Sequence, residues 1–288
     1  MNHVILDYPY VRPEREQIAP TLHERVARES DYTTIVNEDT TVYINDESGR
    51  TEPVFVYLAN WMNNADCAWL MSRLAKVEFG RSARTGRMAS TSRTFGYMPS
   101  RALYQGFCYS SRFNSDYPPI ARRLFGLAKR AGDELEKHNP VVAGMQSAVL
   151  EEQVLEQWKL PGGMFTSGII NKDTALMYHR DAGNYDGSWS AMLGLKDGIR
   201  ENTGMLVVPE LLMAFQIGLG SLTMFAGKEW YHAVTPIQHS RHDGVRYTIV
   251  FYPLQQMCHC GTVEQEVARQ HEKRTLQEMK RAYQGGAE

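Results

Sequence analysis

The chain has 288 residues, a formal net charge of -2 at pH 7 and a 43% share of hydrophobic residues. So large a hydrophobic share excludes an intrinsically disordered chain. So small a net charge excludes a protein that binds nucleic acid or an anionic membrane through its overall charge, which leaves only local basic surfaces. The length fits one large domain or two small ones.

The cysteines and the N-terminus indicate the compartment. The start MNHVILDYPY has no apolar signal core, and the four cysteines are too few and too scattered for a disulfide framework: Cys67, Cys108, Cys258 and Cys260. The most apolar stretch, residues 205–225, is interrupted by proline, glutamate, glutamine and glycine, so it does not predict a membrane span. We expect a reduced, soluble, intracellular protein of the cytoplasm, nucleoid or nucleus, neither secreted nor bound to a membrane.

The N-terminal half predicts a hairpin followed by helices. Residues 41–58 form two β-prone runs around a polar turn, which is typical of a hairpin. Asn63 or Asn64 is a suitable cap for a helix that runs to about Val77. Two further helices are predicted at about 118–138 and 147–158.

From residue 165 to 254 the chain changes to short β-prone segments separated by glycine, asparagine and proline. They are TSGIIN, ALMYH, SWSAMLGL, GMLVVP, LMAFQIG, SLTMFAG, EWYHAVTP and RYTIVFYPL. This pattern predicts an α+β protein with a double-stranded β-helix, or jelly-roll, core. Residues 262–284, rich in charged residues and glutamine, predict an exposed helix. We expect a single domain: a helical and hairpin part over about 1–164, a β core over about 165–255, and the C-terminal helix.

The segment LMYHRDAGNYDG places His179 and Asp181 one residue apart at the end of an apolar run. Residues i and i+2 of a strand project from one face, so the two side chains converge on one point. His232, in EWYHAVTP, supplies a third ligand. Two histidines and one carboxylate form the facial triad of non-haem Fe(II) oxygenases, which leaves coordination positions open for a cosubstrate and O2.

A candidate anchor for the cosubstrate follows on the closing strand. Arg246 and Thr248 share one face of RYTIVFYPL, and a guanidinium beside a hydroxyl suits the distal carboxylate of 2-oxoglutarate. Arg241 is a competing anchor, but it lies in the loop-like stretch QHSRHDG. Each of these residues alone would more often be structural, whereas their order and spacing together favour an iron site.

The stretch CHCG at 258–261 raises the alternative of a zinc site. No second cysteine pair or spaced histidine pair follows it, so a tetrahedral site would have to recruit a distant ligand such as Cys108.

Several segments together resemble the TET/JBP family of Fe(II)- and 2-oxoglutarate-dependent dioxygenases, which oxidise the methyl group of 5-methylcytosine or thymine in nucleic acid. They are SRTFGYMPSR, FTSGIINK, ALMYHRDAGN, GMLVVPE, SLTMFAGKEWYHAVTPI and RYTIVFY, within about 90–255. The large insert and cysteine-rich zinc-binding region of animal members are absent. The chain therefore resembles a small bacterial, phage or protist-type member.

The resemblance implies a role for each matching position. His179, Asp181 and His232 would bind iron, and Arg246 would bind the distal carboxylate of 2-oxoglutarate. Asn184, in the HRDxGN element, would lie beside the metal and contact the cosubstrate or the base.

The stretch from Phe79 to Ser115 is locally basic: it contains arginines interleaved with aromatic residues and no acidic residue. Arginines neutralise phosphates and aromatic rings stack on bases, but such a stretch alone is more typical of a solvated loop with a few core aromatic residues. Because the resemblance to the TET/JBP family covers SRTFGYMPSR, we expect substrate contact here. The methyl group of a duplex base is reached only if the base is flipped or the DNA is single-stranded. The candidate substrate residues are Arg93, Phe95, Tyr97, Asn171 and Trp189.

These observations lead to one main hypothesis, a dioxygenase that uses Fe(II), 2-oxoglutarate and O2 to hydroxylate the 5-methyl group of 5-methylcytosine or thymine in DNA. A first alternative is the same chemistry on a small molecule or free nucleotide, which would make the basic stretch structural. A second is a catalytically silent nucleic-acid-binding relative. A zinc hydrolase is disfavoured because the triad comes with an Arg-x-Thr anchor and no evident general base.

Overall fold

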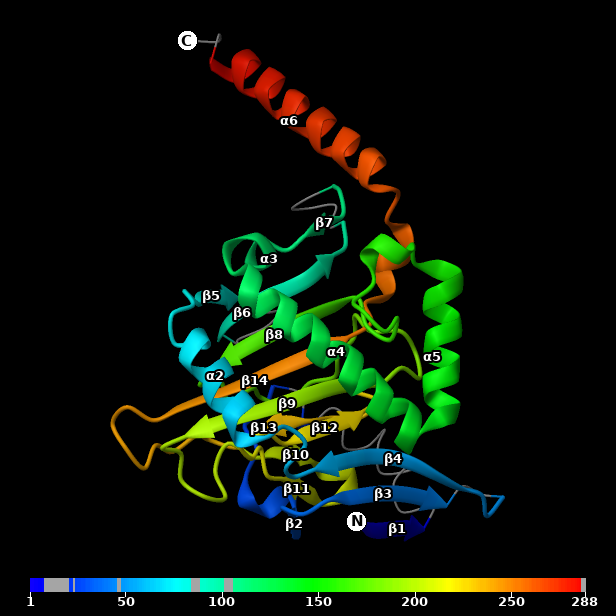
Figure 1. The fold of residues 1–288 in the computed structure, drawn as a ribbon, viewed down its shortest axis with the longest axis vertical. Helices are drawn as coiled ribbons and strands as arrows, with labels where there is room; N and C mark the ends of the chain where they lie inside the picture. The colour runs from blue at the N-terminus through cyan, green and yellow to red at the C-terminus, as the bar shows by residue number, and fades with distance from the viewer. Residues whose placement is uncertain (8–20, 23, 46–47, 84–88, 101–105, 286–288) are drawn as a thin grey trace.

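The computed structural model describes residues 1–7, 21–22, 24–45, 48–83, 89–100 and 106–285. Two facing sheets form its centre (Figure 1). The large sheet has the order β1 (Asn2–Asp7), β3 (Thr40–Asn45), β4 (Thr51–Leu58), β12 (Leu222–Phe225), β9 (Ser190–Asp197), β14 (Val245–Tyr252), β8 (Ser167–Lys172), β6 (Ala89–Met98) and β5 (Gly80–Ala83), with β7 (Tyr109–Ser110) paired to β6. The small sheet has the order β13 (Ala233–Val234), β10 (Leu206–Val208), β11 (Met213–Phe215) and β2 (Thr34–Val36).

Helices cover the outer face of the large sheet, and the small sheet covers its inner face (Figure 1). The main covering helix, α4 (Pro118–His138), buries residues at intervals of three and four, from Ile120 and Leu124 to Leu135. Between the sheets, the ring of Phe55 in β4 stacks on that of Phe215 in β11 at a centroid distance of 3.8 Å. The central strands of the large sheet, such as β9, therefore bury both faces, one against helices and one against the small sheet, whereas the edge strand β1 is largely exposed.

The remaining helices flank this core. They are α2 (Asn64–Leu74), α3 (Arg112–Asp116), α5 (Pro140–Gln153) and α6 (Val263–Gly285), with 3₁₀ turns η1 (Glu29–Asp31), η2 (Glu156–Trp158), η3 (Pro209–Leu211) and η4 (Gln255–His259). Figure 1 shows α6 extending away from the body of the molecule. Among the residues described, no helix is both long and apolar enough to cross a membrane.

The jelly-roll prediction is confirmed, as are the hairpin of β3 and β4 and the helix capped by Asn63, whose side chain accepts a hydrogen bond from the backbone N–H of Asp66. Two element predictions are wrong. The helix expected at 147–158 begins at Pro140 because Asn139 caps it, with proline in the first turn. The segment 175–179 is not a strand, since its pairing with His232 is an isolated bridge at His179.

One expectation about the cysteines is also wrong. Cys108 and Cys260, 152 residues apart in sequence, form a disulfide, whereas Cys67 and Cys258 are free. The pair lies in a small apolar cluster with Trp158, Tyr185 and Met257. The cysteines are too few for a framework, yet the fold brings two of them together, and the CHCG stretch uses Cys260 for this bond.

Reducing this disulfide should lower the free energy of unfolding by about 2–4 kcal/mol, because the cross-link restricts the unfolded chain. Urea denaturation with and without dithiothreitol measures the effect. Cys258→Ser should leave the difference between the two conditions unchanged, and Cys108→Ser should remove that difference. Equal transition midpoints in the two conditions would contradict the bond.

Candidate metal and cosubstrate site

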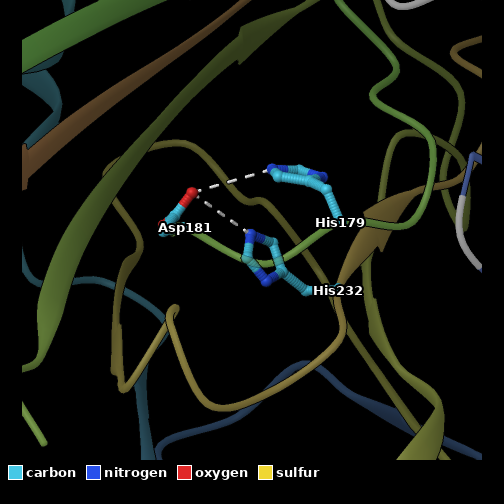
Figure 2. A group of neighbouring side chains, drawn as sticks. All are labelled: His179, Asp181 and His232. Carbon is cyan, nitrogen blue, oxygen red and sulfur yellow. Dashed lines mark ion pairs between the residues drawn. The ribbon is translucent and has the colours of Figure 1, made fainter. Parts of the chain in front are cut away.

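Three side chains meet at one point between the sheets: His179, Asp181 and His232 (Figure 2). Oδ1 of Asp181 lies 3.8 Å from Nε2 of His179 and 4.0 Å from Nε2 of His232. Donor atoms bound to one metal at about 2 Å each lie within about 4 Å of one another, so the spacing suits a single ion. Both histidines are buried, whereas the side chain of Asp181 is 29% exposed, so the cluster opens on the side of the carboxylate.

Backbone hydrogen bonds hold the two histidines side by side. The N–H of His179 donates to the carbonyl of His232 and the N–H of His232 to the carbonyl of His179, both at 3.1 Å. Each ring is then oriented by its other nitrogen: Nδ1 lies 2.8 Å from the Met177 carbonyl in His179 and 3.0 Å from the Trp230 carbonyl in His232. A carbonyl only accepts, so Nδ1 carries the proton and Nε2 keeps its lone pair for a metal.

Asp181 depends on Gly227, a residue that the sequence analysis missed. The backbone N–H of Asp181 donates to the Gly227 carbonyl at 2.9 Å. A Cβ at position 227 would lie only 2.4 Å from Oδ2 of Asp181, closer than real Cβ contacts allow. The carboxylate therefore occupies space that only glycine leaves open. The sequence shows only a glycine in the turn FAGKEW, shortly before His232. Its role can be recognised only from the fold, which pairs this turn with Asp181.

Arg246 is almost fully buried, with 1% of its surface exposed. Nη1 donates to the Thr174 carbonyl at 3.4 Å, whereas Nε and Nη2 have no hydrogen-bond partner in the structure. Burial lowers the pKa of the guanidinium to about 10, and the charge of Asp173 only partly opposes this. Leaving buried donors unsatisfied costs about 1–3 kcal/mol each. An acidic ligand would pair with these donors and offset the buried charge, so the site suits such a ligand.

The strand register shows that this guanidinium and the histidines face one interior. Arg246 in β14 is opposite Lys196 in β9. Alternate residues share a face, so Ser190 at the other end of β9 projects to the same side. Ser190 is opposite Phe225, whose ring lies edge-on to His232 at 5.1 Å. The candidate metal ligands and the candidate anchor therefore line the space between the two sheets.

Thr248 lies two residues from Arg246 on the same face and is buried. Its hydroxyl accepts a hydrogen bond from Nδ2 of Asn171, its neighbour in β8, at 3.3 Å. Asn171, a predicted substrate residue, therefore lies next to the anchor. The competing anchor Arg241 instead forms a surface ion pair with Asp197 at 2.6 Å.

The donor set fits Fe(II) and 2-oxoglutarate. Two imidazoles and a carboxylate form the facial triad that leaves positions open on Fe(II). The two unpaired N–H groups of Arg246 suit a carboxylate in a bidentate arrangement. The charges of Asp181 and Arg246 cancel, so a divalent cation and a dianionic ligand together leave the buried space neutral.

Asn184 and Trp189 follow His179 and Asp181 along the chain, and both are buried. Nδ2 of Asn184 donates to the Ser190 hydroxyl at 3.0 Å, and its backbone carbonyl accepts from Nζ of Lys228 at 2.8 Å. Asn184 thus lies on the loop that carries Asp181, next to the inner face of β9. The backbone N–H of Trp189 donates to the side chain of Gln146 in α5, and its ring belongs to the main core. That placement leaves Trp189 no free ring face for a base.

The structure does not bring Arg93, Phe95 and Tyr97 to the metal. They alternate along β6 and project from its helix-covered face, opposite to the inner face. The Phe95 ring is fully buried over Gly168 and contacts Phe113 of α3. The proposed base contact of Phe95 is therefore corrected to a core role.

The partners of Arg93 and Tyr97 also indicate structural roles. Arg93 forms an ion pair with Asp116, just beyond the acid-free stretch, at 2.8 Å. Tyr97 packs edge-on against Trp158. Three arginines and one tyrosine of the basic stretch lie outside the described residues: Arg84, Arg87, Arg101 and Tyr104.

Comparison with known proteins shows the fold of this chain but does not assign it to a family. No family model matches the chain, and no curated protein matches it. Among solved structures, NgTET1 in complex with 5mC DNA has a TM-score of 0.59 at 15% identity and covers 89% of this chain and 84% of its own. OsALKBH1 has a TM-score of 0.41 at 10% identity, covering 70% of this chain and 97% of its own. The likeness to NgTET1 spans most of both chains and shows a shared fold.

Proposed function

We propose that this chain is an Fe(II)- and 2-oxoglutarate-dependent dioxygenase that hydroxylates the 5-methyl group of a pyrimidine in DNA. One observation carries the proposal: a two-histidine, one-carboxylate cluster and a buried guanidinium with unpaired N–H groups face the same interior. Structural ion pairs satisfy their own donors, whereas two donors of this arginine have no partner in the protein and are available to a ligand.

The candidate residues have two roles, metal binding and cosubstrate binding. His179 and His232 would offer Nε2 and Asp181 Oδ1 to the metal, while Arg246 and Thr248 would hold the distal carboxylate of 2-oxoglutarate. Bound Fe(II) and 2-oxoglutarate supply the oxygen activation, in which one oxygen atom of O2 enters succinate as CO2 is lost and the other enters the product. The chain contributes fixed positions and a space shielded from water between the two sheets.

DNA as the substrate is supported by two observations. NgTET1, which shares the fold, was solved with 5mC DNA. The HRDxGN element that resembles the TET/JBP family carries Asp181, the partly exposed member of the cluster, beside the exposed residues Arg180 and Ala182. A base in a duplex would have to leave the stack to reach this interior, at a cost of a few kcal/mol.

One observation favours a second candidate, the same chemistry on a free nucleotide or another small molecule. The part of the basic stretch that the structure describes is built into the sheet, with Phe95 in the core and Arg93 paired to Asp116. Such residues have structural tasks that do not require a nucleic acid.

Nucleoside mass spectrometry separates these candidates. The protein is incubated with Fe(II), 2-oxoglutarate and air on DNA containing 5-methylcytosine, on DNA containing only thymine, and on the free nucleosides. We expect one base in DNA to gain the mass of one oxygen atom, and His232→Ala to form no product. Oxidation of free nucleosides alone would favour the second candidate. No conversion of 2-oxoglutarate to succinate under any condition would contradict the enzyme.

A further inference from the structure

A segment near the N-terminus packs directly behind the candidate metal site. Leu22 and Ala27 belong to an apolar cluster on the small sheet, with Tyr32 packed against it. The cluster also contains the two residues that immediately precede the histidines, Tyr178 and Tyr231. Residues 22 and 24–32 lie outside the part of the chain that carries the sequence resemblance, so their contact with the site is a finding of the fold.

The segment pairs with the chain beside His179. The backbone N–H of Tyr178 donates to the Arg25 carbonyl at 2.9 Å, and the Tyr178 carbonyl accepts from the N–H of Glu24 at 3.1 Å. Successive residues of an extended chain present their N–H and C=O groups to opposite sides. Tyr178 therefore bonds to the N-terminal segment while His179 bonds to His232, so the ligand-bearing chain is held from both edges.

Side chains reinforce this pairing. The Tyr178 hydroxyl donates to Oδ2 of Asp31 at 2.9 Å, and Nη2 of Arg25 lies 2.7 Å from Oδ1 of the same carboxylate. The Asp31 carboxylate also accepts from the backbone N–H of Arg28 at 2.8 Å. Tyr178 is fully buried and the side chain of Asp31 is 9% exposed, so solvent screens these contacts weakly. One carboxylate thus ties the N-terminal turn to the residue next to a metal ligand.

We propose that Tyr178 and Asp31 are positioning residues of the metal site. They fix the main chain of His179, and with it the direction of Nε2, although neither touches the metal. The inference rests on the proposed function only for the identity of the ligands. It predicts that removing the Tyr178–Asp31 contact weakens metal binding more than it weakens the fold.

The test uses Tyr178→Phe, which removes one hydroxyl, and Asp31→Asn, which keeps an acceptor but loses the charge. Binding of Co(II) alone is followed by its visible absorption, at a temperature where circular dichroism shows every variant folded. Residues that orient metal ligands typically affect metal affinity about 10- to 100-fold, and we expect a weakening in this range for both variants. Tyr57→Phe is the matched control, because Tyr57 is a buried tyrosine in the large sheet and interacts with Ser221 instead.

Co(II) affinity and spectrum equal to those of the unmodified protein, in either folded variant, would overturn the inference even if its melting temperature falls. A variant that fails to fold leaves the decision to the other, since the two remove different atoms of one contact. Failure of the proposed metal site has a different signature: the unmodified protein and Asp181→Ala would then bind Co(II) equally.

Discussion

Gly227→Ala is expected to lower turnover about a hundredfold, since a displacement of about 1 Å at a catalytic site can have that cost. The added methyl group would lie 2.4 Å from Oδ2 of Asp181, and that carboxylate is a candidate metal ligand. It must rotate away, because the hydrogen bond from the Asp181 N–H to the Gly227 carbonyl holds the two main chains together. The variant should therefore resemble Asp181→Ala in activity and in loss of Co(II) binding, while remaining folded.

Gly144→Ala supplies the control. Gly144 lies in α5, and a Cβ there would meet no atom within 4 Å. Alanine in a helix is favoured over glycine by up to about 1 kcal/mol, so this variant should keep full activity and gain some stability. Steady-state succinate formation and Co(II) titration measure both variants. Full activity in folded Gly227→Ala would show that Asp181 does not bind the metal in the orientation described.

Arg246→Met should weaken 2-oxoglutarate binding by about 2–5 kcal/mol, or roughly 30- to 5,000-fold, the usual cost of truncating one member of a buried charge pair. Methionine retains much of the arginine volume but provides no donor for the distal carboxylate. Turnover at saturating 2-oxoglutarate should fall less than the affinity, because the metal ligands are unchanged. The dependence of succinate formation on 2-oxoglutarate concentration measures both effects.

The same variant should not destabilise the protein when cosubstrate is absent. The guanidinium is buried, its pKa is lowered by burial, and two of its donors are unpaired. It therefore lowers the free energy of unfolding of the unliganded protein. Replacing buried charges with apolar side chains of similar volume is often neutral or stabilising. Arg241→Ala is the control, because this exposed arginine pairs with Asp197 and should not affect 2-oxoglutarate binding. Normal affinity in Arg246→Met, or a loss in Arg241→Ala, would reverse the assignment of the anchor.

Local signals in the sequence suffice for some elements and not for others. Asn63 predicts the start of α2 because a cap depends only on the next few residues. The sequence does not predict the strand β6, because its arginine and aromatic residues suggest a nucleic-acid contact instead. The side chains of β6 alternate between its two faces, as is typical of a strand. Ser90 and Ser92 face the interior, whereas Phe95 faces the helices. Which face of a strand turns inward depends on its neighbours, and the neighbour β8 lies far away in sequence.

The candidate ligands are a different case. His179, Asp181, His232 and Arg246 were identified because a metal and a carboxylate require particular atoms, and few residue types provide them. The residues that orient those ligands have no such chemical signature. Gly227 contributes only the absence of a side chain, and Asp31 reaches the site through Tyr178 from a distant part of the chain. Supporting residues of this kind become visible only when the fold is known.

The disulfide has a topological consequence for the whole molecule. The main chain from Cys108 to Cys260, closed by their bond, is a covalent ring that contains every candidate ligand of the metal and the cosubstrate. Residues 1–107, including the segment behind His179, and residues 261–288 are two tails that leave the ring at its closing point. A single cut in the main chain between the two cysteines would therefore open the ring without releasing a fragment.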